Sequence, residues 1–139
     1  MKKINTAVFI SGTGSNLLNL IKFSRKKKSP INIIFILSNK TSAKGLHFAK
    51  KFKIQKQILN FKNSKKAEEK LISFLNKKKI KLVCLAGFMK ILSKNFIKKF
   101  KGKILNIHPS LLPKYKGLNT HERVLNNKEK YSGCTVHFV

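Results

Sequence analysis

The sequence contains no aspartate and no tryptophan, and its four acidic residues are all glutamates. Any chemistry that needs an aspartate, such as a site built on a pair of them, therefore cannot come from this chain. The lack of tryptophan, together with only two tyrosines, argues against an aromatic recognition surface. Thirty lysines and two arginines oppose the four glutamates, so the formal net charge is +28 at pH 7.

Cysteine is scarce, and long apolar runs are missing. Cys84 and Cys134 lie in hydrophobic or strand-like surroundings of a chain with no secretory signal, which predicts two buried free thiols in preference to a disulfide. The run Ala7–Ile10 is too short for the core of a signal peptide. No run approaches the roughly 20 apolar residues of a membrane span. We therefore expect a cytoplasmic protein that makes no membrane contacts.

The positive charge is spread along the chain. Lysines occur in short clusters throughout, whereas arginine, whose planar fork suits bases and phosphates, is nearly absent. This distribution favours a solvated lysine-rich surface over a face built to bind nucleic acid. Such a field would still steer small anionic substrates toward the protein. With 139 residues and a hydrophobic content of 42%, we expect one packed domain over residues 1–139.

Apolar runs and turn residues alternate in a way that predicts strands and helices in turn. The expected strands are 4–10, 31–37, 55–60, 82–86, 103–107 and 134–139. The expected helices are 17–23, 42–52, one from Ser64 onward, 93–100 and 120–127. This order is typical of an α/β domain with a mainly parallel sheet. Such domains bind ligands at the carboxyl ends of strands, so segments 11–16, 87–89 and 106–108 are candidate site segments.

The first candidate, Ser11–Asn16, joins an apolar strand to a helix. Its glycines permit a tight turn, and the amides at a helix start attract anions. The Ser15 hydroxyl and the Asn16 amide add donors, so the segment indicates a phosphate site. It matches neither a Walker loop nor a GxGxxG motif, and a plain strand-to-helix turn is the alternative.

The second candidate is the pair Asn106 and His108, which share one face of an expected strand end because they are two residues apart. An imidazole can take or give a proton near neutral pH, and a neighbouring amide can donate to a developing oxyanion. The alternative is a histidine that bonds a loop beside an asparagine that caps the strand. His47 is expected at the surface, and we expect no metal site.

The third segment, Leu85–Leu92, ends a strand with glycine and continues into large apolar side chains, which fit either a ligand pocket or plain core. Taken together, the segments resemble the phosphoribosylglycinamide formyltransferases, folate-dependent enzymes of purine biosynthesis. The matching stretches are VFISGTGSNL (8–17), SNK (38–40), LAGFMKILS (85–93), LNIHPSLLPKYKG (105–117), TH (120–121) and GCTVHFV (133–139). They follow the family's order along the whole chain. The resemblance implies a Rossmann-like three-layer α/β fold.

The resemblance also implies a reaction. The amine of glycinamide ribonucleotide would attack the formyl carbon of 10-formyltetrahydrofolate, with His108 as general acid/base and Asn106 as hydrogen-bond donor to the formyl oxygen. The ribonucleotide phosphate would bind Gly14, Ser15 and Asn16. The folate would contact Lys65, Met89, Lys90, Ile91, Leu92 and Asn106. The resemblance implies no metal.

Family members are longer than this chain, and an aspartate-bearing loop that orients the catalytic histidine follows their Val-His-Phe-Val strand. We therefore expect residues 1–139 to be an N-terminal part of the enzyme, lacking the family's C-terminal strand and helix and much slower than an extended version. The alternatives are a methionyl-tRNA formyltransferase, a formyltetrahydrofolate hydrolase-like enzyme, or an inactive basic fragment that binds nucleotides or nucleic acid. A homodimer is left open.

Overall fold

The computed structural model describes residues 2–139, apart from the side chain of Ser64. Across this range strands and helices alternate, as predicted. The strands are β1 (Ile4–Ile10), β2 (Ile31–Ser38), β3 (Gln55–Ile58), β4 (Leu82–Leu85), β5 (Lys103–His108) and β6 (Thr135–Phe138). The helices are α1 (Ser15–Ser24), α2 (Leu46–Lys51), α3 (Ser64–Lys77), α4 (Lys94–Lys99) and α5 (Thr120–Asn126).

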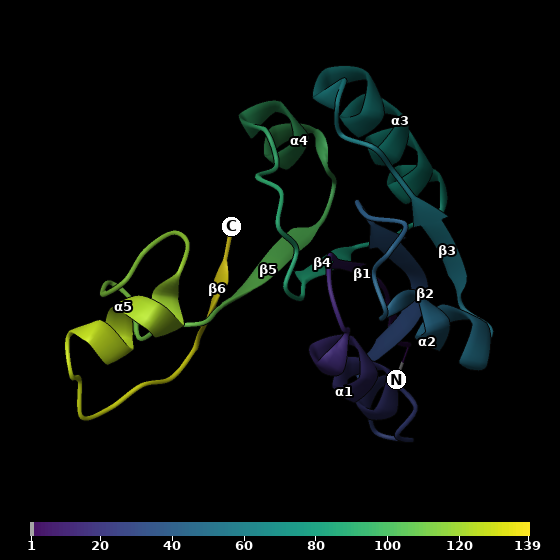
Figure 1. Cartoon of the computed structure of the whole chain (residues 1–139). Coiled ribbons are helices and arrows are strands. Elements are labelled where there is room, and N and C mark those ends of the chain that lie inside the picture. Colours follow the sequence, from purple (N-terminus) through teal and green to yellow (C-terminus); the bar gives the residue numbers. More distant parts are fainter. Residues whose placement is uncertain (1) are drawn as a thin grey trace.

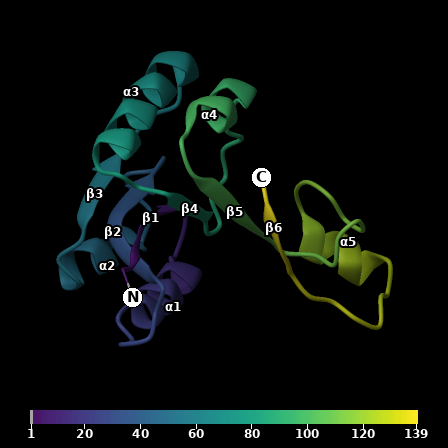
Figure 2. The ribbon, with the colours of Figure 1, turned by 180° about the vertical axis from the view of Figure 1, so that it is seen from behind.

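The strands form one sheet in the order β3-β2-β1-β4-β5-β6 (Figures 1 and 2). All neighbours from β3 to β5 are parallel, and β6 runs antiparallel to β5. The chain builds outward from β1 to β3 and then returns to the other side of β1 with β4. The carboxyl ends of β1 and β4 therefore form the switch point at which such sheets bind ligands.

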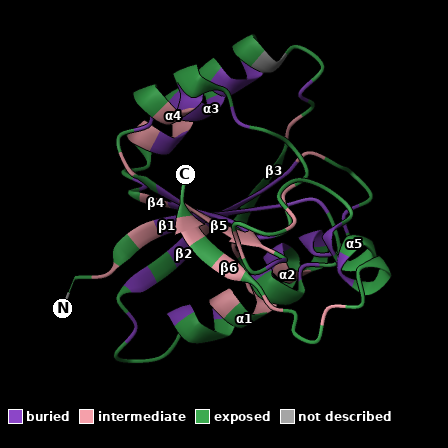
Figure 3. Ribbon diagram, turned by 90° about the vertical axis from the view of Figure 1, so that its left-hand side faces the viewer, coloured by how far each residue is buried: buried purple, intermediate pink, exposed green. Residues whose placement is uncertain are grey.

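Helices cover both faces of the sheet and give the molecule three layers (Figure 3). Successive residues of a strand face opposite sides, so β1 supplies both cores. The core under α3 and α4 includes the fully buried side chains of Phe9, Phe35, Leu75 and Phe96. The core under α1 and α2 includes those of Val8, Ile10, Leu17 and Ile21. The predicted α/β class with a mainly parallel sheet is confirmed.

Helix α2 is shorter than the sequence pattern predicts. It begins at Leu46, four residues later than the expected start at residue 42, and turns occupy the intervening segment. The cause is a close approach of two glycines, because a Cβ on Gly14 would lie 2.7 Å from the Cα of Gly45. The Gly45 N–H also donates to the Gly12 carbonyl at 3.0 Å. The segment before α2 is thus pinned to the loop after β1 and cannot join the helix.

The strand β5 runs one residue further than predicted and includes His108. Its register with β6 places Asn106 opposite His137 and His108 opposite Thr135. Residues that are directly opposite in an antiparallel pair share one face of the sheet. All four side chains are half-buried, whereas Val136 and Phe138 on β6 are exposed.

Both cysteines are free, as predicted, but the expectation that both are buried is wrong. Cys84 lies on the central strand β4 and is buried, whereas Cys134 is exposed because it precedes β6 at the edge of the sheet. Burial raises the pKa of the Cys84 thiol to about 11.

Between β5 and β6 the chain leaves the sheet. A loop and α5 project beyond the β6 edge before the chain turns back (Figures 1 and 2). This excursion carries the residues that surround the end of β5. Among the described residues, no helix combines the length and the apolar character needed to cross a membrane.

Candidate functional site

The loops after β1, β2 and β4 are joined by one buried serine at the end of β1. The hydroxyl of Ser11 accepts a hydrogen bond from the N–H of Met89 at 2.7 Å and donates one to the side-chain oxygen of Asn39. Because these groups follow three neighbouring strands, Ser11 fixes how the loops at the switch point lie relative to one another. Sequence reasoning assigned no such role to Ser11, although it belongs to the candidate segment 11–16.

The predicted phosphate segment lies at the switch point. Gly14 has a φ of 79°, in the left-handed region that glycine tolerates, and α1 begins at the next residue, Ser15. Ser15 and Asn16 are exposed, and they share a cavity of about 140 Å³ with the rest of segment 12–16 and with Ala86 and Gly87. The first N–H groups of a helix have no partner within the helix and attract anions. The structure therefore brings the three predicted residues together at a place suited to a phosphate.

A second cavity, of about 390 Å³, lies at the carboxyl end of β5. Its walls come from segments 87–89, 106–109 and 117–122, so it contains both Asn106 and His108. Gly87 lines this cavity and the smaller one, which places the two side by side. The volume lies in the range of about 300–1,000 Å³ that is usual for small-molecule sites.

The imidazole of His108 is held by the main chain of the following loop. Its Nε2 lies 3.0 Å from the carbonyl oxygen of Tyr115. A carbonyl oxygen can only accept, so Nε2 carries the hydrogen, and the neutral ring keeps a lone pair on Nδ1. His108 can therefore accept a proton through Nδ1.

The predicted folate residues are spread over three environments. Met89 lines the cavity at the end of β5 and is 62% exposed, and Lys90 and Ile91 are exposed beside it in the chain. Leu92 is buried in the core under α3 and α4. Lys65, at the start of α3, lines a separate recess of about 420 Å³ together with residues of α3 and α4. The structure thus brings Met89 to Asn106 and His108, and it does not bring Leu92 or Lys65 there.

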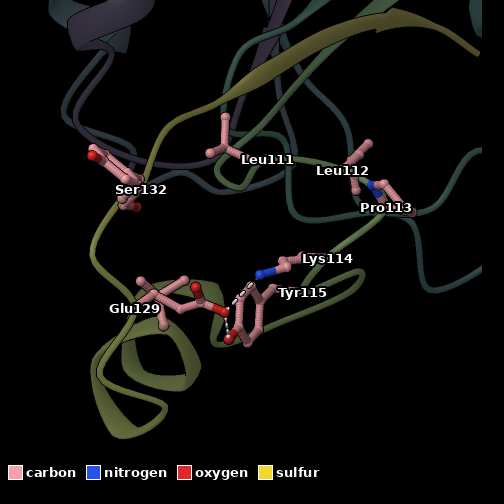
Figure 4. A pocket seen from close by; sticks show the side chains of 9 residues that line it. Leu111, Leu112, Pro113, Lys114, Tyr115, Glu129 and Ser132 are labelled. Carbon is pink, nitrogen blue, oxygen red and sulfur yellow. Dashed lines mark hydrogen bonds and ion pairs between the residues drawn. The ribbon is translucent and has the colours of Figure 1, made fainter.

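Another cavity, of about 370 Å³, lies between residues 111–115 of the loop after β5 and the segment that follows α5 (Figure 4). Within it the carboxylate oxygen Oε1 of Glu129 accepts hydrogen bonds from the Tyr115 hydroxyl at 2.8 Å and from Lys114 Nζ at 3.0 Å. These two bonds hold the pKa of Glu129 below its ordinary value. Sequence reasoning missed this cluster, because its members are 14 and 15 residues apart and share no helix or strand.

The site lies in a strongly positive protein. Of the 139 residues, 32 are cationic and four are anionic, and this net positive charge attracts anionic ligands. Within the part of the chain that the structure describes, no three side chains of histidine, cysteine or glutamate come together as metal ligands would.

Known proteins resemble this chain along nearly its whole length. The family model described as formyl transferase matches residues 4–139. The chain belongs to the formyl transferase family. The match covers the site from the loop after β1 to the end of β6, so all the residues described above lie inside the family's region.

Relatives of this chain include formyl transferase family proteins from bacteria and animals. It is 44% identical over 142 residues to the phosphoribosylglycinamide formyltransferase of Haemophilus influenzae, covering 100% of this chain and 66% of that protein. It is 46% identical over 141 residues to the trifunctional purine biosynthetic protein adenosine-3 of Homo sapiens, covering 99% of this chain and 14% of that protein. The crystal structure of phosphoribosylglycinamide formyltransferase from Brucella melitensis superposes with a TM-score of 0.92 at 40% identity, covering 98% of this chain and 72% of that one. The chain thus spans about two thirds of these bacterial relatives.

Proposed function

We propose that this chain carries the site of a phosphoribosylglycinamide formyltransferase, which moves a formyl group from 10-formyltetrahydrofolate to the amine of glycinamide ribonucleotide in purine biosynthesis. One observation carries the proposal: Gly87 lines both the cavity at the start of α1 and the cavity that holds Asn106 and His108. A single ligand with a phosphate at one end and an amine at the other could therefore occupy both. The names of the bacterial relatives support the same reaction.

The phosphate would bind at Gly14, Ser15 and Asn16. The N-terminus of α1 carries a partial positive charge and unpartnered amides, and the exposed side chains of Ser15 and Asn16 add donors. Because the surrounding surface is so rich in lysine, the field also favours a dianionic group. Neither effect needs a lysine inside the loop.

The chemistry would take place at Asn106 and His108. The substrate amine forms a bond to the formyl carbon, and the bond from that carbon to the folate nitrogen breaks. The amine loses a proton to Nδ1 of His108, and the imidazolium returns a proton to the departing folate nitrogen. One N–H of the Asn106 amide donates to the formyl oxygen while negative charge develops on it.

The folate would lie along the segment after β4. Met89 offers an exposed apolar side chain in the cavity at the end of β5, and Ile91, which is 97% exposed, extends that apolar surface. Lys90 and Lys65 offer ammonium groups for an anionic part of the folate, and buried Leu92 supports the segment from beneath. We further propose a cytoplasmic location, with which two free cysteines agree.

The test is a formyl-transfer assay with three acceptors offered separately: glycinamide ribonucleotide, initiator methionyl-tRNA and water. It uses the chain itself and a fusion that appends the remaining third of the Haemophilus influenzae relative, each with and without His108→Ala. We expect transfer to glycinamide ribonucleotide alone, faster in the fusion, and a loss of about 10²–10⁴-fold with His108→Ala. Transfer to the tRNA or to water instead, or a turnover rate that His108→Ala leaves unchanged, would contradict the proposal.

A further inference from the structure

The carbonyl that holds His108 belongs to a residue that is itself held from several sides. Tyr115 has a φ of 54°, a left-handed conformation that costs energy in a residue with a side chain. The hydroxyl of Ser110, a residue that is 1% exposed, donates to the neighbouring Lys114 carbonyl at 2.7 Å and lies 3.3 Å from the Tyr115 carbonyl. The position of the carbonyl thus depends on the loop between His108 and Tyr115, and not on a regular strand or helix.

The side chain of Tyr115 is anchored to the segment after α5. Its hydroxyl donates to Glu129 at 2.8 Å, and Lys114 Nζ donates to the same carboxylate oxygen at 3.0 Å (Figure 4). The guanidinium of Arg123, on α5, lies 5.3 Å from the centre of the Tyr115 ring. The main-chain N–H of Glu129 donates to the Val124 carbonyl at 3.2 Å, which ties the carboxylate to α5.

Charge strengthens this anchor. The hydrogen bonds to Glu129 raise the pKa of the Tyr115 hydroxyl and of Lys114, and they lower the pKa of Glu129. All three groups are therefore in their bonding forms at neutral pH, with the hydroxyl protonated, the amine charged and the carboxylate ionised. Hydrogen bonds to an ionised acceptor are stronger than those between neutral groups.

We propose that Tyr115 is a positioning residue for His108: Glu129 holds the Tyr115 side chain, and the Tyr115 carbonyl keeps the hydrogen of the imidazole on Nε2 so that Nδ1 faces the reaction. The inference rests on the proposed function because that function makes Nδ1 the nitrogen that accepts the proton of the substrate amine. The tautomer itself can be observed without substrate. His108 is thereby oriented by a neutral main-chain group. The anionic group that secures the arrangement is the carboxylate of Glu129, which acts on His108 through Tyr115.

The test reads the tautomer of His108 directly. Long-range nitrogen–proton NMR spectra of the whole chain, labelled with nitrogen-15 histidine and recorded where the ring is neutral, distinguish hydrogen on Nε2 from hydrogen on Nδ1. We expect the Nε2–H form in the unmodified chain, and a rise of about tenfold in the Nδ1–H form in Tyr115→Phe and in Glu129→Ala. Glu129→Gln, whose amide oxygen can still accept from Tyr115, should restore most of the original tautomer. Unchanged Nε2–H in both Tyr115→Phe and Glu129→Ala would overturn the proposal.

A matched control is available in Tyr131→Phe. This change removes the same hydroxyl from the other tyrosine, whose side chain is 81% exposed, and it should leave the tautomer of His108 unchanged. A shift as large as that of Tyr115→Phe would mean that any change in this region disturbs His108, and the proposal would fail.

Formyl transfer gives a second readout that separates this proposal from the proposed function. Tyr115→Phe should lower kcat by about tenfold and leave KM nearly unchanged, since a misoriented base affects the chemical step more than binding. If the tautomer responds as expected but no variant transfers formyl groups, the proposed function fails and the positioning stands. If transfer occurs and Tyr115→Phe changes neither the tautomer nor kcat, the positioning fails and the function stands.

Discussion

Asn106 and His137 face each other across the antiparallel pair β5–β6, with the side-chain nitrogen Nδ2 of Asn106 3.2 Å from Nε2 of His137. The other ring nitrogen, Nδ1 of His137, lies 3.0 Å from the carbonyl oxygen of Phe138. That oxygen can only accept, so Nδ1 carries the hydrogen and Nε2 of the neutral ring accepts from Asn106. One amide hydrogen of Asn106 is thereby fixed, and the other is directed away from His137.

This contact predicts that His137 orients Asn106. His137→Leu should lower kcat/KM for formyl transfer by about tenfold, because Asn106 keeps its amide but loses the partner that sets its rotation. Asn106→Ala, which removes the donor itself, should cost about 10²–10³-fold. His47→Leu is the control, since His47 is exposed on α2 and its ring bonds the Lys44 carbonyl. Equal rates for His137→Leu and the control would show that Asn106 needs no partner.

The close approach of two glycines predicts a stability effect at the phosphate loop. Gly14→Ala should destabilise the fold by about 1–3 kcal/mol. An alanine at this position would have to keep the left-handed φ, and its Cβ would lie 2.7 Å from the Cα of Gly45. Gly12→Ala is the matched control, since a Cβ at Gly12 would meet nothing within 4 Å. Urea unfolding of both variants measures the difference. Identical midpoints for the two would mean that α2 can move away from the loop at no cost.

Much of the site could be predicted from the sequence, because its residues follow strands. The spacing of Asn106 and His108 places them on one face of a strand, and the glycines around Ser15 follow an apolar run. Both features involve only residues that are close in the sequence, so they do not depend on how distant parts of the chain pack. The carboxyl ends of parallel strands then bring them to the same edge of the sheet.

The rest depended on contacts that no local pattern records. The role of His137 depends on the register of β6 against β5, and the role of Tyr115 depends on the path of a loop that has no repeating geometry. Leu92 shows the opposite difficulty. Its apolar side chain fits a pocket wall or the core equally well in the sequence, and only the packing of α3 and α4 places it in the core.

A buried carboxylate links α3 to α4 and predicts a second stability effect. Glu68 is 2% exposed, and its carboxylate accepts hydrogen bonds from both the N–H and the hydroxyl of Ser93, the N-cap residue of α4. Glu68→Ala should cost about 1–3 kcal/mol in unfolding free energy, since it leaves the Ser93 groups without that partner. Glu68→Gln, which keeps an acceptor, should cost less. Glu69→Gln at the exposed neighbouring position should be neutral, and a comparable loss there would contradict the assignment.

The carboxylate of Glu129 predicts a dependence of stability on acid. Its pKa in the folded chain is held below the ordinary value by Lys114 and Tyr115, so the stabilisation is complete above the pKa of the unfolded chain. It is lost as the pH falls through the folded pKa. The stability difference between the unmodified chain and Glu129→Gln should therefore shrink on going from about pH 6 to about pH 3. Chemical denaturation at several pH values measures it, with Glu122→Gln as control, and a difference that stays constant would rule out the contribution.

The two thiols should differ sharply in reactivity. The thiolate is the reactive form, and burial raises the pKa of Cys84 to about 11, whereas Cys134 is exposed ahead of β6. At mildly alkaline pH, iodoacetamide should modify Cys134 in the folded chain and leave Cys84 intact, and in denaturant it should modify both. Peptide mapping by mass spectrometry identifies the site, and Cys134→Ser should abolish modification of the folded chain. Rapid modification of Cys84 in folded Cys134→Ser would show that β4 opens to solvent far more readily than its central place in the sheet implies.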